Sequence, residues 1–342
     1  MTENYLKSVD ELIRRKTCLA IMGPTASGKS GLSMLLAKAL PIEIISVDSA
    51  LVYRGMNVGT AKPSSAEMQA VPHHLIDTHG VDQSYSASEF VEDAYRLVEE
   101  IFARNRLPVF VGGTMMYFNA LQKGMSDLPS ADEAVREKLL QQWQAEPQSM
   151  HERLCEVDPQ AAERIHPNDP QRLIRALEVF EVTGTPLSEF QAQPKNALKA
   201  FKLIKVGLIP EDRARLHAQI EERFMQMLED GFLQEVKGLY ERGDLNVEMT
   251  SIRSVGYRQA WLFLQGEYDY ETFVHKAVVA TRQLAKRQLT WLRKESDMLV
   301  LDPFQITVEQ RLQAVLKTLE DEASSEILDE PKKAFIHGIE SG

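Results

Sequence analysis

The sequence predicts an α/β fold: a parallel β-sheet core like that of the P-loop NTPases, with an inserted α-helical domain. Short apolar runs rich in β-branched residues alternate with helical patterns along most of the chain, as in a parallel sheet covered by helices. A glycine-rich motif of eight residues stands between the first apolar run and the helix that follows it. From Gly124 to about Lys202, by contrast, no strand pattern appears and prolines interrupt a series of helical segments.

The expected strands are apolar runs too short for helices, at 17–22, 43–47, 108–111, 203–208 and 298–301. One helix is expected from residue 30 to about 40. Two others begin at capping boxes, Ser86 with Glu89 and Ser130 with Glu133, and the first of these reaches about Asn105. Gly184 is expected to end a further helix. Long helices are predicted over 211–242 and 272–294.

The predicted domains follow from these elements. Residues 1–124 and 200–319 form the core with the glycine-rich motif, and residues 125–199 form the helical insertion. Residues 320–342 hold seven acidic residues, two lysines and few aromatic residues, so an acidic, disordered tail is predicted there.

Composition favours a soluble protein of a reducing cytoplasm. The 342 residues carry a net charge of −11, and no apolar run approaches the roughly 20 residues of a membrane span. The first 16 residues are polar and lack the apolar stretch of a secretory signal, and the chain has two cysteines, Cys18 and Cys155. Residues 251–294 contain eight basic and three acidic residues, which fits either an RNA-binding face or a solvated helix face.

The glycine-rich motif is a complete phosphate loop with the sequence Gly23-Pro24-Thr25-Ala26-Ser27-Gly28-Lys29-Ser30. The two glycines permit a tight turn whose backbone N–H groups face inward, the lysine places a charge on a terminal phosphate, and the Ser30 hydroxyl can hold Mg²⁺. The helix behind the loop adds its positive N-terminal end. The motif therefore predicts a phosphate or diphosphate site with Mg²⁺ as cofactor, and leaves open whether the phosphate belongs to ATP.

Other residues have more than one interpretation. Asp48 follows the second strand and should emerge beside the phosphate loop, as a metal ligand, a general base or a helix N-cap. Gly112-Gly113 suggest either a close approach of backbone to ligand or a simple turn. His73-His74 fit a polar contact better than a shared metal ion, because adjacent residues of a strand face opposite sides. Arg223, at the edge of an apolar helical stripe, is either functional or a surface arginine.

Longer motifs resemble a known family. In chain order they are GPTASGKS, ISVDSALVYRGMNVGTAKPS, VPHHLID, VGGTMMYFNAL, RIHPNDPQRLIRALEVF, SIRSVGYRQ and ATRQLAKRQLTWLR. Together they span about residues 17–300 and resemble the bacterial tRNA dimethylallyltransferases, also called IPP transferases. Leu51, Val52 and Met116 depart from the family's commonest residues, and position 51 bears on RNA contact.

The resemblance implies transfer of a dimethylallyl group from dimethylallyl diphosphate to N6 of adenosine 37 in tRNA, which gives N6-(dimethylallyl)adenosine and diphosphate. The diphosphate and Mg²⁺ would occupy the phosphate loop. Asp48 would accept or orient the N6 proton, while Thr25, Lys29 and Arg223 would neutralise the leaving diphosphate. A monomer is expected.

The resemblance also implies which residues contact the tRNA anticodon stem-loop, from which the adenosine must be extruded. They are Asp48, Ser49, Ala50, Leu51, Thr114, Arg136, Gln171, Arg172, Leu173, Ile174, Arg175, Ile252, Arg253, Gly256, Tyr257, Arg258 and Gln259.

Two other functions fit part of the sequence. A small-molecule kinase would bind ATP in the same loop, and thermal protection by ATP rather than by dimethylallyl diphosphate would identify it. A nucleotide-gated RNA-binding module would bind tRNA without changing the mass of adenosine 37.

Overall fold

The computed structural model describes residues 2–124, 128–129, 131–192 and 200–325. The chain divides into two compact units. The first comprises Met1–Tyr117 and Lys199–Gly342, and the second comprises Phe118–Leu198. The second unit begins earlier than the predicted start at residue 125, inside helix α5 (Met115–Lys123).

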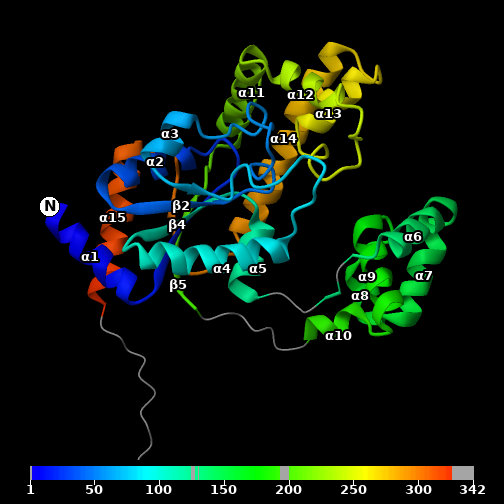
Figure 1. Cartoon of the computed structure of the whole chain (residues 1–342), viewed down its shortest axis with the longest axis horizontal. Helices are drawn as coiled ribbons and strands as arrows, with labels where there is room; N and C mark the ends of the chain where they lie inside the picture. Colours follow the sequence, from blue (N-terminus) through cyan, green and yellow to red (C-terminus); the bar gives the residue numbers. More distant parts are fainter. Residues whose placement is uncertain (1, 125–127, 130, 193–199, 326–342) are drawn as a thin grey trace, which may run out of the picture. The chain divides into compact units, whose positions relative to one another are not determined.

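A six-stranded parallel sheet forms the centre of the first unit (Figure 1). Its strand order is β3-β2-β4-β1-β5-β6. The strands are β1 (Thr17–Met22), β2 (Ile42–Val47), β3 (His73–His74), β4 (Leu107–Gly112), β5 (Lys202–Leu208) and β6 (Met298–Leu301). The predicted α/β parallel sheet is confirmed, together with the five predicted strands. The short β3 was missed because two residues are too few to show a periodic pattern.

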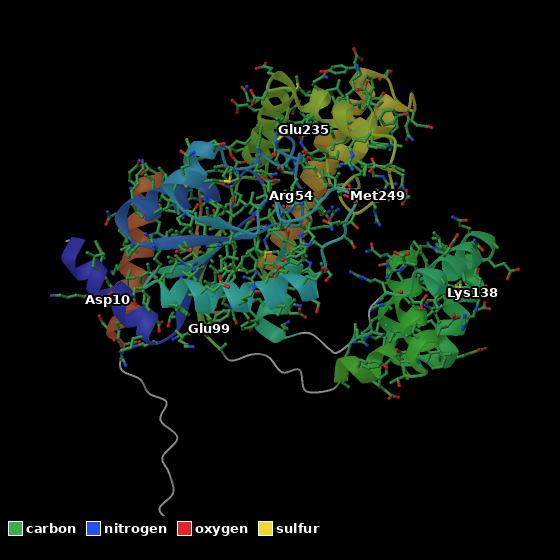
Figure 2. All side chains as sticks on the ribbon, in the orientation of Figure 1. Asp10, Arg54, Glu99, Lys138, Glu235 and Met249 are labelled. Atoms are coloured by element: carbon green, nitrogen blue, oxygen red, sulfur yellow. The ribbon has the colours of Figure 1, made fainter. Side chains whose placement is uncertain are left out.

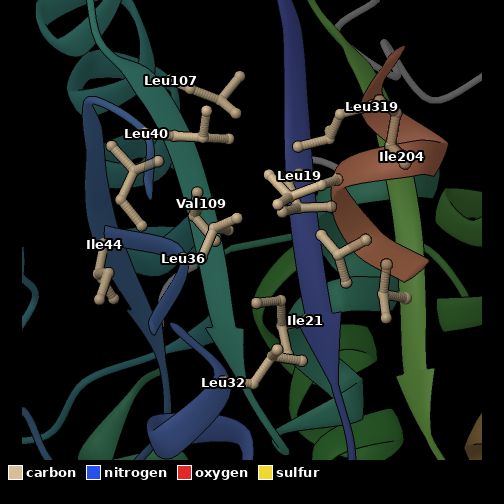
Figure 3. Packing of buried hydrophobic residues seen from close by; sticks show 14 of the residues in the cluster. Leu19, Ile21, Leu32, Leu36, Leu40, Ile44, Leu107, Val109, Ile204 and Leu319 are labelled. Carbon is tan, nitrogen blue, oxygen red and sulfur yellow. The ribbon is translucent and has the colours of Figure 1, made fainter. Parts of the chain in front are cut away.

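Helices cover both faces of this sheet, which explains why the central strands β1 and β2 are buried along their whole length. One face packs on α1 (Thr2–Arg14), α2 (Lys29–Ala39) and α15 (Val308–Ser324). The cluster between them, shown in Figure 3, includes Leu19, Ile21, Leu32, Leu36, Ile44, Val109, Ile204 and Leu319. The other face meets α4. There the ring of Phe110 stacks on Phe201 at 5.9 Å, and Phe201 contacts Tyr95 of α4.

In the first unit, α2 (Lys29–Ala39), α4 (Ala87–Ala103) and α14 (Tyr270–Leu292) lie where the sequence predicts a helix. Ser86 and Glu89 form the predicted capping box of α4. The single helix predicted over 211–242 is wrong, because Gly231 adopts a φ of +96° and separates α11 from α12. The helices are α1 (Thr2–Arg14), α2 (Lys29–Ala39), α3 (Ser65–Ala70), α4 (Ala87–Ala103), α11 (Arg213–Glu229), α12 (Phe232–Tyr240), α13 (Tyr257–Leu264), α14 (Tyr270–Leu292) and α15 (Val308–Ser324).

Helix α15 corrects the predicted start of the acidic tail. The tail was expected from residue 320, but the helix continues to Ser324. Its apolar residues Val315, Leu316 and Leu319 are buried against α2, so packing rather than charge decides the structure here. The rest of the predicted tail, from residue 326, lies outside the described residues.

The second unit is built from helices, and its described residues contain no strand. Its core is apolar and centres on Leu139, Leu154 and Leu177. Gly184 ends α9 with a φ of +71°, as predicted, whereas α6 is capped by Asp132 instead of Ser130, which lies outside the described residues. Besides α5, the helices are α6 (Glu133–Ala145), α7 (Pro147–Val157), α8 (Pro159–Arg164), α9 (Pro170–Thr183) and α10 (Leu187–Ala192). In the described part of the chain, no helix is both long enough and apolar enough to span a membrane.

Candidate active site

The carboxyl ends of β1, β4 and β2 lie side by side and bring three loops together. Gly112 at the end of β4 pairs with Met22 of β1 and with Val47 of β2. The Gly23 N–H donates to the Gly112 carbonyl (3.3 Å), and the Thr114 N–H donates to the Val47 carbonyl (3.1 Å). A Cβ at Gly112 would lie 2.1 Å from the Val47 carbonyl oxygen. The glycine is therefore required for close backbone packing at the edge where parallel sheets bind ligands.

The phosphate loop turns through two left-handed residues, Ala26 with φ +62° and Gly28 with φ +82°. The Ser27 hydroxyl donates to the Pro24 carbonyl (2.9 Å) and holds the turn. Helix α2 begins directly afterwards, at Lys29, and no side chain caps it at Gly28. Its first backbone N–H groups are consequently available to an anion, and the helix dipole favours negative charge at this end.

Gln288 of α14 joins the phosphate loop to the loop after β4. Its side-chain oxygen accepts from the Thr25 N–H (2.9 Å), and its Nε2 donates to the Gly113 carbonyl (2.9 Å). A Cβ at Gly113 would come within 2.5 Å of that Nε2. Gln288 was not among the predicted site residues, although it lies in the ATRQLAKRQLTWLR motif.

Lys29, Arg223 and Asp48 interact electrostatically beside the loop. The half-buried Lys29 donates through Nζ to the Pro24 carbonyl (2.7 Å). Burial, with the nearby Arg223 cation, lowers the pKa of Lys29 to about 8, and Asp48 partly opposes this shift. Burial also lowers the pKa of Arg223, again against the effect of Asp48. Arg223 is thus a half-buried cation near the phosphate loop, and not a solvated arginine on the helix surface.

Asp48 organises the turn that follows β2. Its Oδ1 accepts from the Ala50 N–H (2.8 Å) and the Leu51 N–H (3.3 Å). This is a side-chain turn of the kind that aspartate favours, not a helix N-cap. Within the described part of the chain, no hydrogen bond reaches its second oxygen, Oδ2. The Ser49 N–H donates to the Thr114 hydroxyl (3.2 Å), so the predicted RNA contacts at 48–51 and 114 adjoin one another.

Glu235 of α12, labelled in Figure 2, fixes the chain at 57–59. Its Oε2 accepts from the Asn57 N–H (2.7 Å) and the Val58 N–H (2.8 Å). Its Oε1 accepts from the Gly59 N–H (3.2 Å) and the Tyr257 hydroxyl (2.5 Å). Burial and the Glu235 carboxylate raise the pKa of Tyr257, which keeps the phenol a donor. One carboxylate therefore connects this loop to the start of α13. Glu235 was not among the predicted site residues.

The predicted RNA contacts near α13 divide into buried and exposed residues. The side chains of Ile252 and Tyr257 are fully buried and serve the core of the unit. The Gln259 side chain accepts from the Gly256 N–H (2.9 Å). Arg253 is exposed, so it is the member of this group whose side chain is best placed for solvent and ligands.

In the second unit, Arg136 and Arg175 both bind the fully buried carboxylate of Glu178, each at 3.0 Å. Arg175 also donates to the Pro129 carbonyl (2.7 Å). Arg172 is exposed and lies 3.5 Å from Asp169. The two arginines of α9 that are predicted to contact tRNA therefore differ: Arg172 is exposed, whereas Glu178 and Pro129 bind Arg175 inside the unit. Two further predicted contacts have side chains buried in the helical core: Leu173 and Ile174.

Neither histidine of the His73-His74 pair is arranged as a metal ligand. The His73 Nδ1 lies 2.8 Å from the Val71 carbonyl, and the His74 Nε2 lies 2.7 Å from the Glu43 carboxylate. The described residues contain no cluster of three or more His, Cys, Asp or Glu suited to a metal. The exposed Ser30, in the first turn of α2, fits a Mg²⁺ ion that takes most of its ligands from phosphate and water.

A model of the IPP transferase family matches residues 51–295 of the chain. The chain belongs to this family. The tRNA dimethylallyltransferase of Hydrogenovibrio crunogenus is 64% identical to this chain. The match covers 91% of this chain and 97% of that enzyme. The tRNA dimethylallyltransferase of Coxiella burnetii (strain Dugway 5J108-111) is 54% identical, over 82% of this chain and 90% of its own length.

Solved structures of similar proteins agree with this assignment. The full-length tRNA isopentenylpyrophosphate transferase of Bacillus halodurans is 37% identical, with a TM-score of 0.66 over 90% of this chain and 98% of that one. A eukaryotic dimethylallyltransferase acting on tRNA is 29% identical, with a TM-score of 0.76 over 90% of this chain and 80% of that one. The range matched by the family model includes Arg223, Glu235 and Gln288, and begins after the phosphate loop.

Proposed function

We propose that this IPP transferase-family protein transfers the dimethylallyl group of dimethylallyl diphosphate to N6 of adenosine 37 in tRNA. One observation carries the proposal: a phosphate loop with two half-buried cations, Lys29 and Arg223, lies in electrostatic contact with the Asp48 carboxylate. The cations suit a diphosphate leaving group, and the carboxylate suits an amine that must lose a proton. The names of the relatives point to the same reaction.

The leaving group would be stabilised by groups already fixed in the fold. The ammonium of Lys29 and the guanidinium of Arg223 would take the charge that develops on the diphosphate, with the Thr25 hydroxyl and the N-terminus of α2 as further donors. The Gln288 bond to the Thr25 N–H holds the loop in place. A preorganised donor of this kind is worth about 3 kcal/mol in the transition state.

The acceptor step requires a base beside the reacting carbon. The N6 lone pair forms a bond to C1 of the dimethylallyl group, the C1–O bond breaks, and diphosphate departs with the bonding electrons. One N6 proton passes to Asp48, whose Oδ1 is held by the turn at Ala50 and Leu51. Oδ2 is the oxygen suited to accept it.

Mg²⁺ is proposed as the cofactor, held on the protein side by Ser30. When bound, it would neutralise part of the diphosphate charge. The RNA partner is proposed to be the anticodon stem-loop, with adenosine 37 extruded from its stack at a cost of roughly a few kcal/mol. The exposed Arg172 and Arg253 are the predicted contacts best suited to phosphates. We also propose that the protein is a monomer and acts in the cytoplasm. Analytical sedimentation tests whether it is a monomer.

The proposal is tested by measuring diphosphate release from purified protein with dimethylallyl diphosphate, Mg²⁺ and tRNA. Release should require tRNA, and a Lys29→Ala variant should show little of it. Phosphate transfer from ATP without prenylation would favour a kinase instead. Thermal protection by dimethylallyl diphosphate but not by ATP would support the transferase in a separate assay.

A further inference from the structure

A cation of α15 lies against the phosphate loop, outside the residues that match the family model. Helix α15 packs on α2: its Val315 and Leu316 share one hydrophobic cluster with Leu32 and Leu36 of α2. Arg311 lies four residues before Val315 and therefore on the same face of the helix. The packing thus directs Arg311 toward the start of α2.

The guanidinium reaches the loop itself. Its Nη1 lies 3.0 Å from the position that a Cβ on Gly28 would occupy, and it is the nearest described atom there outside the adjoining residues of the chain. Gly28 directly precedes Lys29 and is the N-cap of α2. The Arg311 Nε donates to the Thr307 carbonyl (3.3 Å), which leaves the Nη groups at the loop. The Arg311 side chain forms no salt bridge with any residue that the structure describes.

The environment of Arg311 suits an anion. The residue is half-buried, and burial lowers its pKa, so its positive charge is incompletely solvated. A diphosphate ester carries about three negative charges at neutral pH. Lys29 and Arg223 supply two positive charges, the proposed Mg²⁺ supplies two more, and the N-terminus of α2 adds a partial one. Arg311 would add a guanidinium at the outer edge of the loop, where its Nη1 can donate a charge-assisted hydrogen bond to a phosphate oxygen.

We propose that Arg311 is a further diphosphate-binding residue, which donates to the outer phosphate of dimethylallyl diphosphate and of the diphosphate product. This inference rests on the proposed function, because it takes the diphosphate to occupy the phosphate loop. Arg311 binds and positions the substrate, and it takes no part in proton transfer. The helix after the last strand thereby contributes to the diphosphate site.

The test compares Arg311→Gln with Lys317→Gln, which removes an exposed cation from the same helix. Affinity for inorganic diphosphate with Mg²⁺ is measured by calorimetry, and KM is measured for each substrate. Arg311→Gln should weaken diphosphate binding and raise the KM for dimethylallyl diphosphate about tenfold, the effect of one charge-assisted hydrogen bond. Arg311→Lys should recover part of the loss. Lys317→Gln should match the wild type, and KM for tRNA should change little in all three variants.

Equal diphosphate affinity in Arg311→Gln and Lys317→Gln would overturn the inference, as would a change confined to the KM for tRNA. The melting temperature in the absence of ligand identifies a variant that has lost packing, and Arg311→Lys keeps the test valid in that case. If the wild type transfers dimethylallyl groups but the Lys29→Ala variant binds diphosphate as tightly as the wild type, the assignment of the diphosphate to the phosphate loop is contradicted. A wild type with no transferase activity would contradict the proposed function.

Discussion

Replacing Glu235 by glutamine should release the loop at 57–59 from α12. The Glu235 carboxylate accepts four hydrogen bonds, two at each oxygen. Three come from backbone N–H groups and one comes from the Tyr257 hydroxyl. Glutamine keeps one accepting oxygen and turns an NH₂ group toward two donors. Losing two charge-assisted bonds, partly relieved by water because Glu235 is half-buried, should cost about 2–3 kcal/mol of local stability.

Hydrogen exchange of the amides of Asn57, Val58 and Gly59 measures this cost where it arises. A loss of 2–3 kcal/mol corresponds to exchange that is faster by about 30-fold or more. Glu241→Gln is the matched control, because Glu241 lies at the end of the same helix and forms an exposed pair with Lys237 at 3.6 Å. Equal exchange in the two variants would refute the reasoning. The KM for tRNA should also rise in Glu235→Gln, while the KM for dimethylallyl diphosphate should not.

Three further predictions concern charged groups. The pKa of Lys29 is about 8 in the free protein, and its protonated form is the one that binds diphosphate. The value of kcat/KM for dimethylallyl diphosphate should therefore fall above pH 8, by up to about tenfold per pH unit. A flat pH profile up to about pH 10 would contradict this prediction. Asp48→Asn keeps an oxygen for the turn but loses the base, so single-turnover rates should fall roughly 10²–10⁴-fold at unchanged melting temperature, whereas a merely positional role predicts a near-normal rate. In a salt series, Arg172→Ala should flatten the salt dependence of tRNA affinity by about one unit of slope. Arg175→Ala should instead lower the melting temperature, because the buried Glu178 carboxylate loses one of its two arginine partners. Equal effects of both substitutions on tRNA affinity, with no change in melting temperature, would contradict this distinction.

The parts of the fold and site that could be predicted from sequence are those with a local signal. Strands buried on both faces are short apolar runs, the phosphate loop is a contiguous motif, and Asp48 follows a strand end directly. A helix boundary failed where one glycine, Gly231, divides an otherwise periodic run. The last helix, α15, was not predicted, and its end was assigned to the acidic tail because composition near residue 320 outweighed the apolar spacing that packs Leu319.

The interactions that could not be predicted join residues far apart in the sequence. Gln288 reaches the loop at Thr25, Glu235 binds the loop at 57–59, and Arg311 approaches Gly28. No periodic pattern marks a single polar residue whose partner is set by the packing of two helices. Burial of a charged group such as Glu178 is equally hidden, since charged residues are usually exposed and its two arginine partners become evident only in the folded unit.

The most direct test of the central claim is mass spectrometry of nucleosides from tRNA incubated with the protein, dimethylallyl diphosphate and Mg²⁺. We expect N6-(dimethylallyl)adenosine at position 37, formed more slowly by Asp48→Asn and Arg223→Ala, and no product when position 37 is guanosine. Unmodified adenosine 37 under conditions in which the protein binds both tRNA and dimethylallyl diphosphate would contradict it.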